Sequence, residues 1–408
     1  MHKIERLLHT LAPKGVEFRK LGEVLEYDQP NKYCVTNKEF DKSYPTPVLT
    51  AGKTFILGYT NEKDNIYQAS KSSPVIIFDD FTTATQWVDF PFKVKSSAMK
   101  ILLPKNPTIN IRFIFFYMQT IPYNIGGEHA RHWISRYSQL EVPIPPLEIQ
   151  QEIVKILDAF TELNTELNTE LKARKKQYQY YQNMLLDFKD TNQSHKDAKE
   201  KLAQKPYPKR LKTLLQTLAP KGVEFRKLGE VINIFKGKQL NKELLLDYGE
   251  YPVMNGGIYA SGYWNEYNTD CQKIIISQGG ASAGYVNYMT SKFWAGAHCY
   301  AIELNSEKLN YKFLYYFLKN SQTILMKSQF GAGIPALNKA DIETLTIPIP
   351  PLEIQQEIVK ILDQFSILTT DLLAGIPAEI KARKKQYEYY REKLLTFKPL
   401  TPHKEVKK

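Results

Sequence analysis

The sequence predicts an α+β protein in which two related α+β domains are separated by two long helices that pair with each other. Two repeats carry this prediction. The segments 142–189 and 347–398 begin almost identically, with VPIPPLEIQQEIVKILD and IPIPPLEIQQEIVKILD. The segment Leu8–Val24 returns as Leu215–Val231 with one difference in seventeen positions. The chain therefore consists of two halves, each with a short leading segment, a variable domain and a long helix.

Each repeated PIPPL segment has the pattern of a long amphipathic helix. Apolar residues recur at steps of three and four, which place them on one helical face. Pro146 and Pro351 suit a first helical position, where no N–H is needed. A helix from 147 to 189 would be ~65 Å long at ~1.5 Å per residue, and it cannot bury such a stripe alone. We expect its duplicate to be the partner; an ordinary amphipathic helix used twice is the alternative. The stripe comprises Ile149, Ile153, Ile156, Phe160, Leu163, Leu167 and Leu171.

The two helices differ in their middle parts. The first carries a tandem tetrad, TELN at 161–164 and again at 165–168. The matching interval of the second helix, 366–379, is longer and contains Gly375-Ile-Pro377. Because glycine and proline disfavour a helix interior, we expect the second helix to kink or break there.

The two variable domains share a skeleton although their sequences diverge. Short apolar runs at 74–78 and 273–277 read as buried strands. The apolar segments 110–119 and 310–319 predict a core helix, whose aromatic residues are expected to pack rather than to stack on bases. The predicted boundaries are 1–24 (leading segment), 25–141 (first domain), 142–189 (central helix), 190–231 (linker and second leading segment), 232–346 (second domain), 347–398 (C-terminal helix) and 399–408 (basic tail).

Composition indicates a cytoplasmic protein. The chain has 408 residues, of which 43% are hydrophobic, enough for two or three domains with real cores. Its three cysteines, Cys34, Cys271 and Cys299, are scattered, which fits a reducing compartment and argues against a structural zinc site. The first ten residues lack the apolar core of a signal peptide, and no run approaches the ~20 apolar residues of a membrane span.

The formal charge of +12 favours a polyanionic partner. The basic excess, however, is concentrated in the linker 190–212 and in the tail 398–408, and such segments are usually just solvated. Charge alone therefore leaves nucleic-acid binding open.

Motifs for catalysis are missing from the sequence. It contains no GxxxxGK[ST], no GxGxxG after a strand and no HExxH. The Pro-Ile-Pro-Pro strings at the helix starts lack the acid and the aromatic residue of an adenine methyltransferase motif. Asp79 and Asp80, followed by Lys93 and Lys95, are a pattern that a metal-dependent nuclease could use. The second half of the chain has no counterpart of this pattern. We expect the chain by itself to catalyse nothing.

The repeated PIPPLEIQQEIVKILD helix starts, the LGEV leading segments and the divergent domains resemble the specificity subunit of Type I restriction–modification systems. The resemblance covers nearly the whole chain. It implies that each variable domain is a target recognition domain that reads one half of a split, double-stranded DNA sequence. It also implies that the long helices form an antiparallel coiled-coil that spaces the domains and docks the modification subunits, which we expect to number two. Those subunits would bind S-adenosylmethionine and methylate adenine, and restriction subunits would bring ATP and Mg²⁺.

Two different domains on one repeated frame predict an asymmetric target. Base edges are distinguished by amides, guanidinium groups and hydroxyls, so polar loop residues are the candidates. For each of them a phosphate contact or a solvated side chain is the alternative. In the first domain the candidates are Lys53, Thr82, Thr83, Thr85, Gln86, His129, Arg131 and His132, with Arg131 and Gln86 the strongest. In the second they are Asn255, Tyr259, Gln278, Ser282 and Lys339.

Two basic clusters recur in the long helices and are candidates for binding partner subunits, although a charge run is often only a solvated face. They are Arg174, Lys175 and Lys176 in the first helix and Arg383, Lys384 and Lys385 in the second. Two other functions stay open at this stage. One is a self-sufficient DNA-modifying enzyme, and the other is a scaffold that joins proteins through its paired helices without reading DNA.

Overall fold

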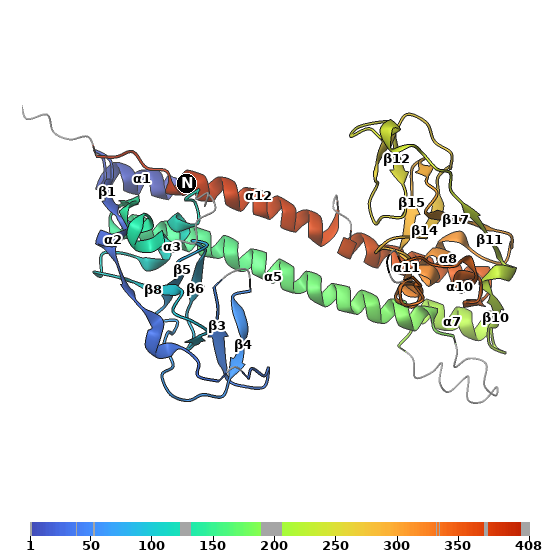
Figure 1. The fold of residues 1–408 in the computed structure, drawn as a ribbon, viewed down its shortest axis with the longest axis horizontal. Helices are drawn as coiled ribbons and strands as arrows, with labels where there is room; N and C mark the ends of the chain where they lie inside the picture. The colour runs from blue at the N-terminus through green and yellow to red at the C-terminus, as the bar shows by residue number, and fades with distance from the viewer. Residues whose placement is uncertain are drawn as a thin grey trace, which may run out of the picture. The chain divides into compact units, whose positions relative to one another are not determined.

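The computed structural model describes residues 2–400, except for 38, 52–53, 123–131, 189–205, 332, 334 and 371–373. The chain forms two compact units (Figure 1). The first unit contains residues 1–167 and 380–408, and the second contains residues 168–379. None of the described helices is both long and apolar enough to cross a membrane.

The first unit contains a four-stranded antiparallel sheet, ordered β2-β8-β5-β6, and a three-stranded sheet, ordered β4-β3-β7. Strand β5 is buried along its whole length, as its apolar run predicts. A separate two-stranded sheet joins β1 of the leading segment to β9, directly before the long helix. The bounds are α1 (His2–Leu11), β1 (Glu17–Lys20), α2 (Leu21–Val24), β2 (Leu25–Asp28), β3 (Thr46–Leu49), β4 (Ile56–Thr60), β5 (Val75–Asp79), β6 (Thr85–Val88), β7 (Lys93–Val94), β8 (Met99–Pro104), α3 (Ile111–Met118), α4 (His132–Ser135), β9 (Glu141–Ile144) and α5 (Leu147–Leu186).

The second unit repeats this topology. Its sheets are ordered β11-β17-β14-β15 and β13-β12-β16, and β10 pairs with β18 as β1 pairs with β9. The repeat seen in the sequence is therefore a repeat of the fold. The bounds are α7 (Lys209–Leu218), β10 (Glu224–Lys227), β11 (Ile232–Lys236), β12 (Tyr251–Met254), β13 (Gly262–Trp264), β14 (Lys273–Ser277), β15 (Val286–Met289), β16 (Trp294–Ala295), β17 (Cys299–Leu304), α8 (Tyr311–Asn320), α9 (Gln322–Lys327), α10 (Lys339–Glu343), β18 (Thr346–Ile349), α11 (Leu352–Thr370) and α12 (Gly375–Leu395).

The long helices pair within each unit, as predicted. In the first unit α5 runs antiparallel to α12 (Figure 1), and Phe160 stacks on Tyr390 with ring centroids 5.6 Å apart. In the second unit Tyr181 of α5 stacks on Phe365 of α11 at 5.2 Å. The buried stripe includes Leu157, which the predicted pattern omitted and which is fully buried.

Several predicted boundaries shift by a few residues. Residues 142 and 347, the predicted starts of the long helical segments, lie in strands β9 and β18. Each helix begins one residue after the proline; the Pro146 carbonyl accepts the N–H of Gln150 at 3.2 Å. The predicted interruption is confirmed, because α11 ends at Thr370 and α12 begins at Gly375. The predicted tail starts inside the fold, since Leu400 donates its N–H to the Val16 carbonyl at 3.0 Å.

One buried glutamine fixes each variable domain to its helix. The Gln150 amide oxygen accepts the Asn110 N–H at 2.8 Å, and its amide nitrogen donates to the carbonyls of Pro145 at 2.7 Å and Thr108 at 3.1 Å. Gln355 makes the three equivalent bonds in the second unit, at 2.7, 2.6 and 2.8 Å. Both side chains are fully buried. We call this arrangement the glutamine joint; it satisfies three backbone groups at the point where domain and helix meet.

Candidate nucleic-acid interface

The turn between β5 and β6, residues 80–84, holds two of the candidates of the first domain, Thr82 and Thr83. The Asp79 carboxylate closes it by accepting the N–H groups of Phe81 at 3.0 Å and Thr82 at 3.3 Å, together with the Thr82 hydroxyl. Thr83 follows with a positive φ of 58°. The turn therefore presents the exposed Thr82 on a rigid backbone.

The two candidates on strand β6 face different environments. The Thr85 hydroxyl accepts a hydrogen bond from the side chain of Gln119, which follows helix α3. The Gln86 side chain is exposed on β6, which is the edge strand of its sheet. Gln86 is therefore better placed than Thr85 to offer its amide to a base.

His132 is a wrong candidate for contacting DNA. His132 is only 1% exposed, because helix α4 is anchored in the interior of the domain. The backbone N–H of His132 donates to the Asp80 carbonyl at 2.9 Å, and that of Trp133 donates to the Asp80 carboxylate at 2.9 Å. The ammonium of the buried Lys100 lies 3.7 Å from the same carboxylate. Three further candidates, Lys53, His129 and Arg131, lie outside the described residues.

The acidic pair considered for a nuclease has structural partners instead. Asp79 closes its turn and Asp80 caps helix α4, as described above. Lys93 is buried and forms an ion pair with Glu62 at 2.7 Å. Across the part of the chain that the structure describes, no three His, Cys, Asp or Glu side chains are grouped as metal ligands. These carboxylates hold the turn 80–84 and helix α4 in place.

Glu62 is the charged anchor of the first domain. Its carboxylate accepts the N–H groups of Thr36 and Asn37, each at 2.8 Å, and pairs with the Lys93 ammonium. Burial alone would raise the pKa of Glu62, but the backbone N–H of Asn37, the Lys93 ammonium and Thr36 together lower this pKa to about 2.

Replacing Glu62 with Gln should destabilise the first unit by about 2–3 kcal/mol near neutral pH, because it leaves the buried Lys93 without its counter-charge. The pKa of Glu62 is depressed in the folded state, from 4.5 to about 2. Its stabilisation is therefore complete above the unfolded pKa and is lost as the pH falls through this window. Urea unfolding of both proteins at a series of pH values measures the difference, which should shrink below pH 4.5.

Glu39→Gln is the matched control, because Glu39 is exposed and close by in the sequence. We expect it to leave the free energy of unfolding nearly unchanged. An equal loss in both variants, or a Glu62 effect that does not depend on pH, would contradict the assignment.

In the second domain the structure brings two of the candidates together through His298. The Asn255 side-chain oxygen accepts the His298 N–H at 3.2 Å, and the Gln278 N–H donates to the His298 carbonyl at 2.8 Å. The ends of β12 and β14 therefore meet the turn before β17. His298 is exposed in this cluster, and sequence reasoning missed it. Its only signal was a polar residue inside a Gly/Ala-rich turn that precedes a buried strand.

The loop 278–285 forms the centre of this cluster. The Gln278 carbonyl accepts the Leu337 N–H at 2.8 Å, two residues before Lys339, which opens helix α10. The Ser282 carbonyl accepts the Tyr285 N–H at 2.9 Å, and Ser282 is half-exposed.

Tyr259 and Lys339 are the two most exposed types of candidate in this domain, an aromatic ring and an ammonium group. Tyr259 is 82% exposed, and its loop is tied to β15 by the side chain of Asn287, which donates to the Ile258 carbonyl at 3.0 Å. Lys339 is exposed and forms an ion pair with Glu343 at 3.3 Å, one helical turn further on. Asn255, Gln278 and His298, from separate segments, are thus joined by hydrogen bonds.

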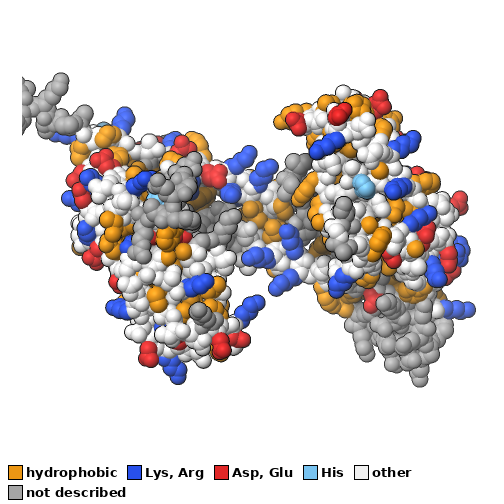
Figure 2. Space-filling model, in the orientation of Figure 1, with side chains coloured by type: hydrophobic (Ala, Val, Ile, Leu, Met, Phe, Trp, Pro, Cys, Tyr) orange, Lys and Arg blue, Asp and Glu red, His pale blue; other side chains and the backbone are white. Residues whose placement is uncertain are grey.

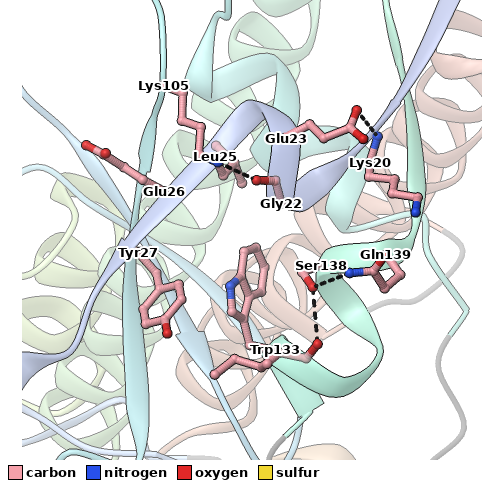
Figure 3. A pocket seen from close by; sticks show the side chains of 11 residues that line it. Lys20, Gly22, Glu23, Leu25, Glu26, Tyr27, Lys105, Trp133, Ser138 and Gln139 are labelled. Atoms are coloured by element: carbon pink, nitrogen blue, oxygen red, sulfur yellow. Dashed lines mark hydrogen bonds between the residues drawn. The ribbon is translucent and has the colours of Figure 1, made fainter.

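A cavity of about 600 Å³ lies in the first unit between the leading segment and helix α4 (Figure 3). The Trp133 ring and Tyr27 line it, and Lys105 donates to the Gly22 carbonyl at its rim. A Cβ placed on Gly22 would lie 3.1 Å from Ser138. The corresponding glycine of the second unit, Gly229, meets the Cβ of Glu343 at the same distance, so this close approach is repeated.

The basic clusters of the long helices present mainly their lysines. The Arg174 guanidinium is held along the helix by Glu170 at 3.4 Å and by Gln177 at 3.1 Å. Arg383 is likewise bonded to Gln386, at 3.3 Å. Figure 2 shows basic side chains gathered over the long helices, whereas elsewhere on this face they are mixed with acidic ones. The lysines concerned, Lys175, Lys176, Lys384 and Lys385, are all exposed.

Comparisons with known proteins agree with this arrangement. The family described as Type I restriction modification DNA specificity domain matches residues 13–195 and 220–382. The specificity subunit of the Escherichia coli Type I restriction enzyme EcoR124I/EcoR124II is 37% identical over 98% of both chains. A putative Type I specificity subunit from Haemophilus influenzae is 29% identical over 97% of this chain and 98% of that protein.

Two solved structures share the fold. The Type I S subunit of M. genitalium matches with a TM-score of 0.63 and 18% identity, over 93% of this chain and 96% of that one. A chain from a structural study of complex assembly in a Type I R-M system matches with a TM-score of 0.53 and 16% identity, over 94% and 98%. Both family matches and the full-length similarity lead to one conclusion: the chain belongs to the family of Type I restriction–modification DNA specificity subunits.

Proposed function

We propose that this chain recognises an asymmetric, bipartite double-stranded DNA target and positions adenine methyltransferase subunits, with restriction subunits, on that target. The observation that carries the proposal is the repeat of one topology with different loops. The glutamine joint, the leading segments and the helix starts are nearly the same in both halves. The loops 80–84 and 278–285, at equivalent places in the two sheets, differ in length and chemistry. Two domains with different loops, held by nearly identical segments, fit the recognition of two different half-sites.

The partners follow from the same repeat. A frame that occurs twice offers equivalent surfaces to two copies of one modification subunit. In this proposal the chemistry belongs to the partners, which hold S-adenosylmethionine, ATP and Mg²⁺, while this chain supplies sequence recognition. The names of the relatives, specificity subunits of Type I restriction enzymes, support that division of labour.

Mapping methylated adenines across the genome of a host that carries this gene and its neighbours tests the proposal. We expect methylation at one split motif with two different half-sites, lost when this gene alone is deleted. Methylation that persists without the gene would reject a role in target recognition. Methylation by the purified chain alone, given S-adenosylmethionine, would instead identify a self-sufficient enzyme.

Reversing the charge of Arg174, Lys175 and Lys176 to Glu should weaken binding of the modification subunit in solution by at least about 10-fold, even without DNA. Three reversed charges on an exposed helical face remove attraction to an acidic partner surface and add repulsion. Titration calorimetry or analytical ultracentrifugation at low and high salt measures the change, which should shrink as salt screens the charges.

The matched control reverses Lys236, Lys238 and Lys242, which are equally exposed but lie in the second domain. This control should assemble normally. Unchanged assembly of the helix variant would remove the cluster from the interface.

A further inference from the structure

The loop 278–285 of the second domain lacks a side-chain cap like the Asp79 carboxylate, which closes the turn 80–84 of the first domain. Asp79 and Ser277 occupy equivalent positions at the ends of β5 and β14, opposite Met99 and Cys299. The Asp79 carboxylate caps the turn 80–84 from within. The Ser277 hydroxyl instead donates to the Gly256 carbonyl, outside the loop.

This loop also has more conformational freedom to lose. It is three residues longer than the turn 80–84 and contains three glycines. Every added residue, and glycine most of all, raises the entropic cost of holding one conformation. Gly284 has a φ of +87°, and a Cβ there would lie 2.7 Å from the backbone of Leu325. Groups outside the loop help to hold its conformation.

Lys319, at the end of helix α8, holds the point where the loop returns to the sheet. Its ammonium donates to the Val286 carbonyl at 2.7 Å and to the Gln322 side-chain oxygen at 2.9 Å. It also lies 4.1 Å from the centre of the Tyr285 ring. The same Gln322 oxygen accepts the Val286 N–H at 3.0 Å, so Lys319 and Gln322 both hydrogen-bond to the backbone of Val286.

The partners of Lys319 are neutral groups. Within the described parts of the chain it forms no ion pair, and burial lowers its pKa to about 8. The groups that face it are the Val286 carbonyl, the Gln322 amide and the Tyr285 ring. In the first domain the equivalent position is Gln119, an uncharged donor that contacts Thr85 at the matching place on β6. What the two positions share is the hydrogen-bond donor.

We propose that Lys319 is a positioning residue for DNA recognition by the second domain. It anchors the end of the loop 278–285 to the corner between α8 and α9, so that Ser282 meets the bases of one half-site. This inference rests on the proposed function and assigns one residue's part in it.

The test uses the full chain assembled with its modification subunits. Methylation rates are measured on duplexes that carry the mapped target and on duplexes with single changes in either half-site. For Lys319→Met we expect at least about 10-fold loss of discrimination at the half-site read by residues 232–346, and none at the other. Lys319→Gln should stay within about 3-fold of wild type, because glutamine restores the donor used in the first domain.

Three further variants separate positioning from general damage. Lys327→Met removes an exposed lysine from the neighbouring helix α9 and should change nothing. Gln119→Met should affect only the other half-site, and less strongly, because Asp79 still closes that turn. Gln322→Met removes the other side-chain hydrogen bond to the Val286 backbone and should cause the same loss at this half-site as Lys319→Met. It tests the inference independently if Lys319→Met is too unstable to assay.

The inference is overturned if Lys319→Met keeps full discrimination, if both half-sites lose it together, or if Lys319→Gln is as poor as Lys319→Met. Failure of the proposed function looks different, because the wild-type complex would then methylate without any sequence preference.

Discussion

Replacing residues 25–140 with the equivalent domain of a relative should change one half-site of the methylated target completely and leave the other unchanged. The glutamine joint explains why such an exchange is tolerated. Gln150 bonds to backbone groups of the domain, the Asn110 N–H and the Thr108 carbonyl, rather than to its side chains. A domain with different surface side chains but the same backbone path can therefore make the same hydrogen bonds to Gln150. Mapping methylated adenines before and after the exchange measures the result.

The reciprocal exchange of residues 232–346 is the control, and it should alter only the other half-site. A single exchange that changes both half-sites would show that the two domains do not read independently.

Deleting Thr165–Asn168, one tetrad, should shorten the unread gap between the half-sites by one or two base pairs. Helix α5 is continuous through the tetrads; the hydroxyls of Thr161 and Thr165 donate to the carbonyls of Leu157 and Thr161 at 2.9 and 2.8 Å. Four residues fewer shorten a helix by ~6 Å, at ~1.5 Å per residue. Because DNA rises ~3.4 Å per base pair, ~2 base pairs is the upper limit.

The deletion also rotates the rest of the helix by ~40°, since ~3.6 residues make one turn, and the pairing of the helices must absorb this. Neither half-site sequence should change, because no reading residue is touched. Replacing Thr165 and Asn168 with Ala keeps the length and should keep the gap. An active deletion variant with the original gap would show that this helix does not set the spacing.

The leading segments and the long helices could be predicted from the sequence because each of them occurs there twice. The helix starts, the pairing of the helices and the break near Gly375 all depend on local signals, namely periodicity, proline and glycine. The central strands β5 and β14 also follow from continuous apolar runs. These features need no knowledge of which distant residues meet.

The recognition surface was much less predictable because long-range contacts decide it. His132 stands in a polar stretch and reads as a loop residue, yet it is buried, and its N–H donates to the carbonyl of Asp80, which lies far away in the sequence. His298 was missed because its backbone, rather than its side chain, joins Asn255 to Gln278. Side-chain chemistry alone does not reveal which polar residue is covered.

The glutamine joint has a consequence for how the gene can change. Each variable domain is bordered by stretches of near-identical sequence, the leading segment before it and the PIPPL helix start after it. Homologous recombination between two such genes can cross over inside these borders and transfer a whole domain. Because Gln150 and Gln355 bind backbone groups of the incoming domain, this part of the contact does not depend on its side chains. One crossover pair then yields a host with a new methylation pattern, without the slow accumulation of point mutations.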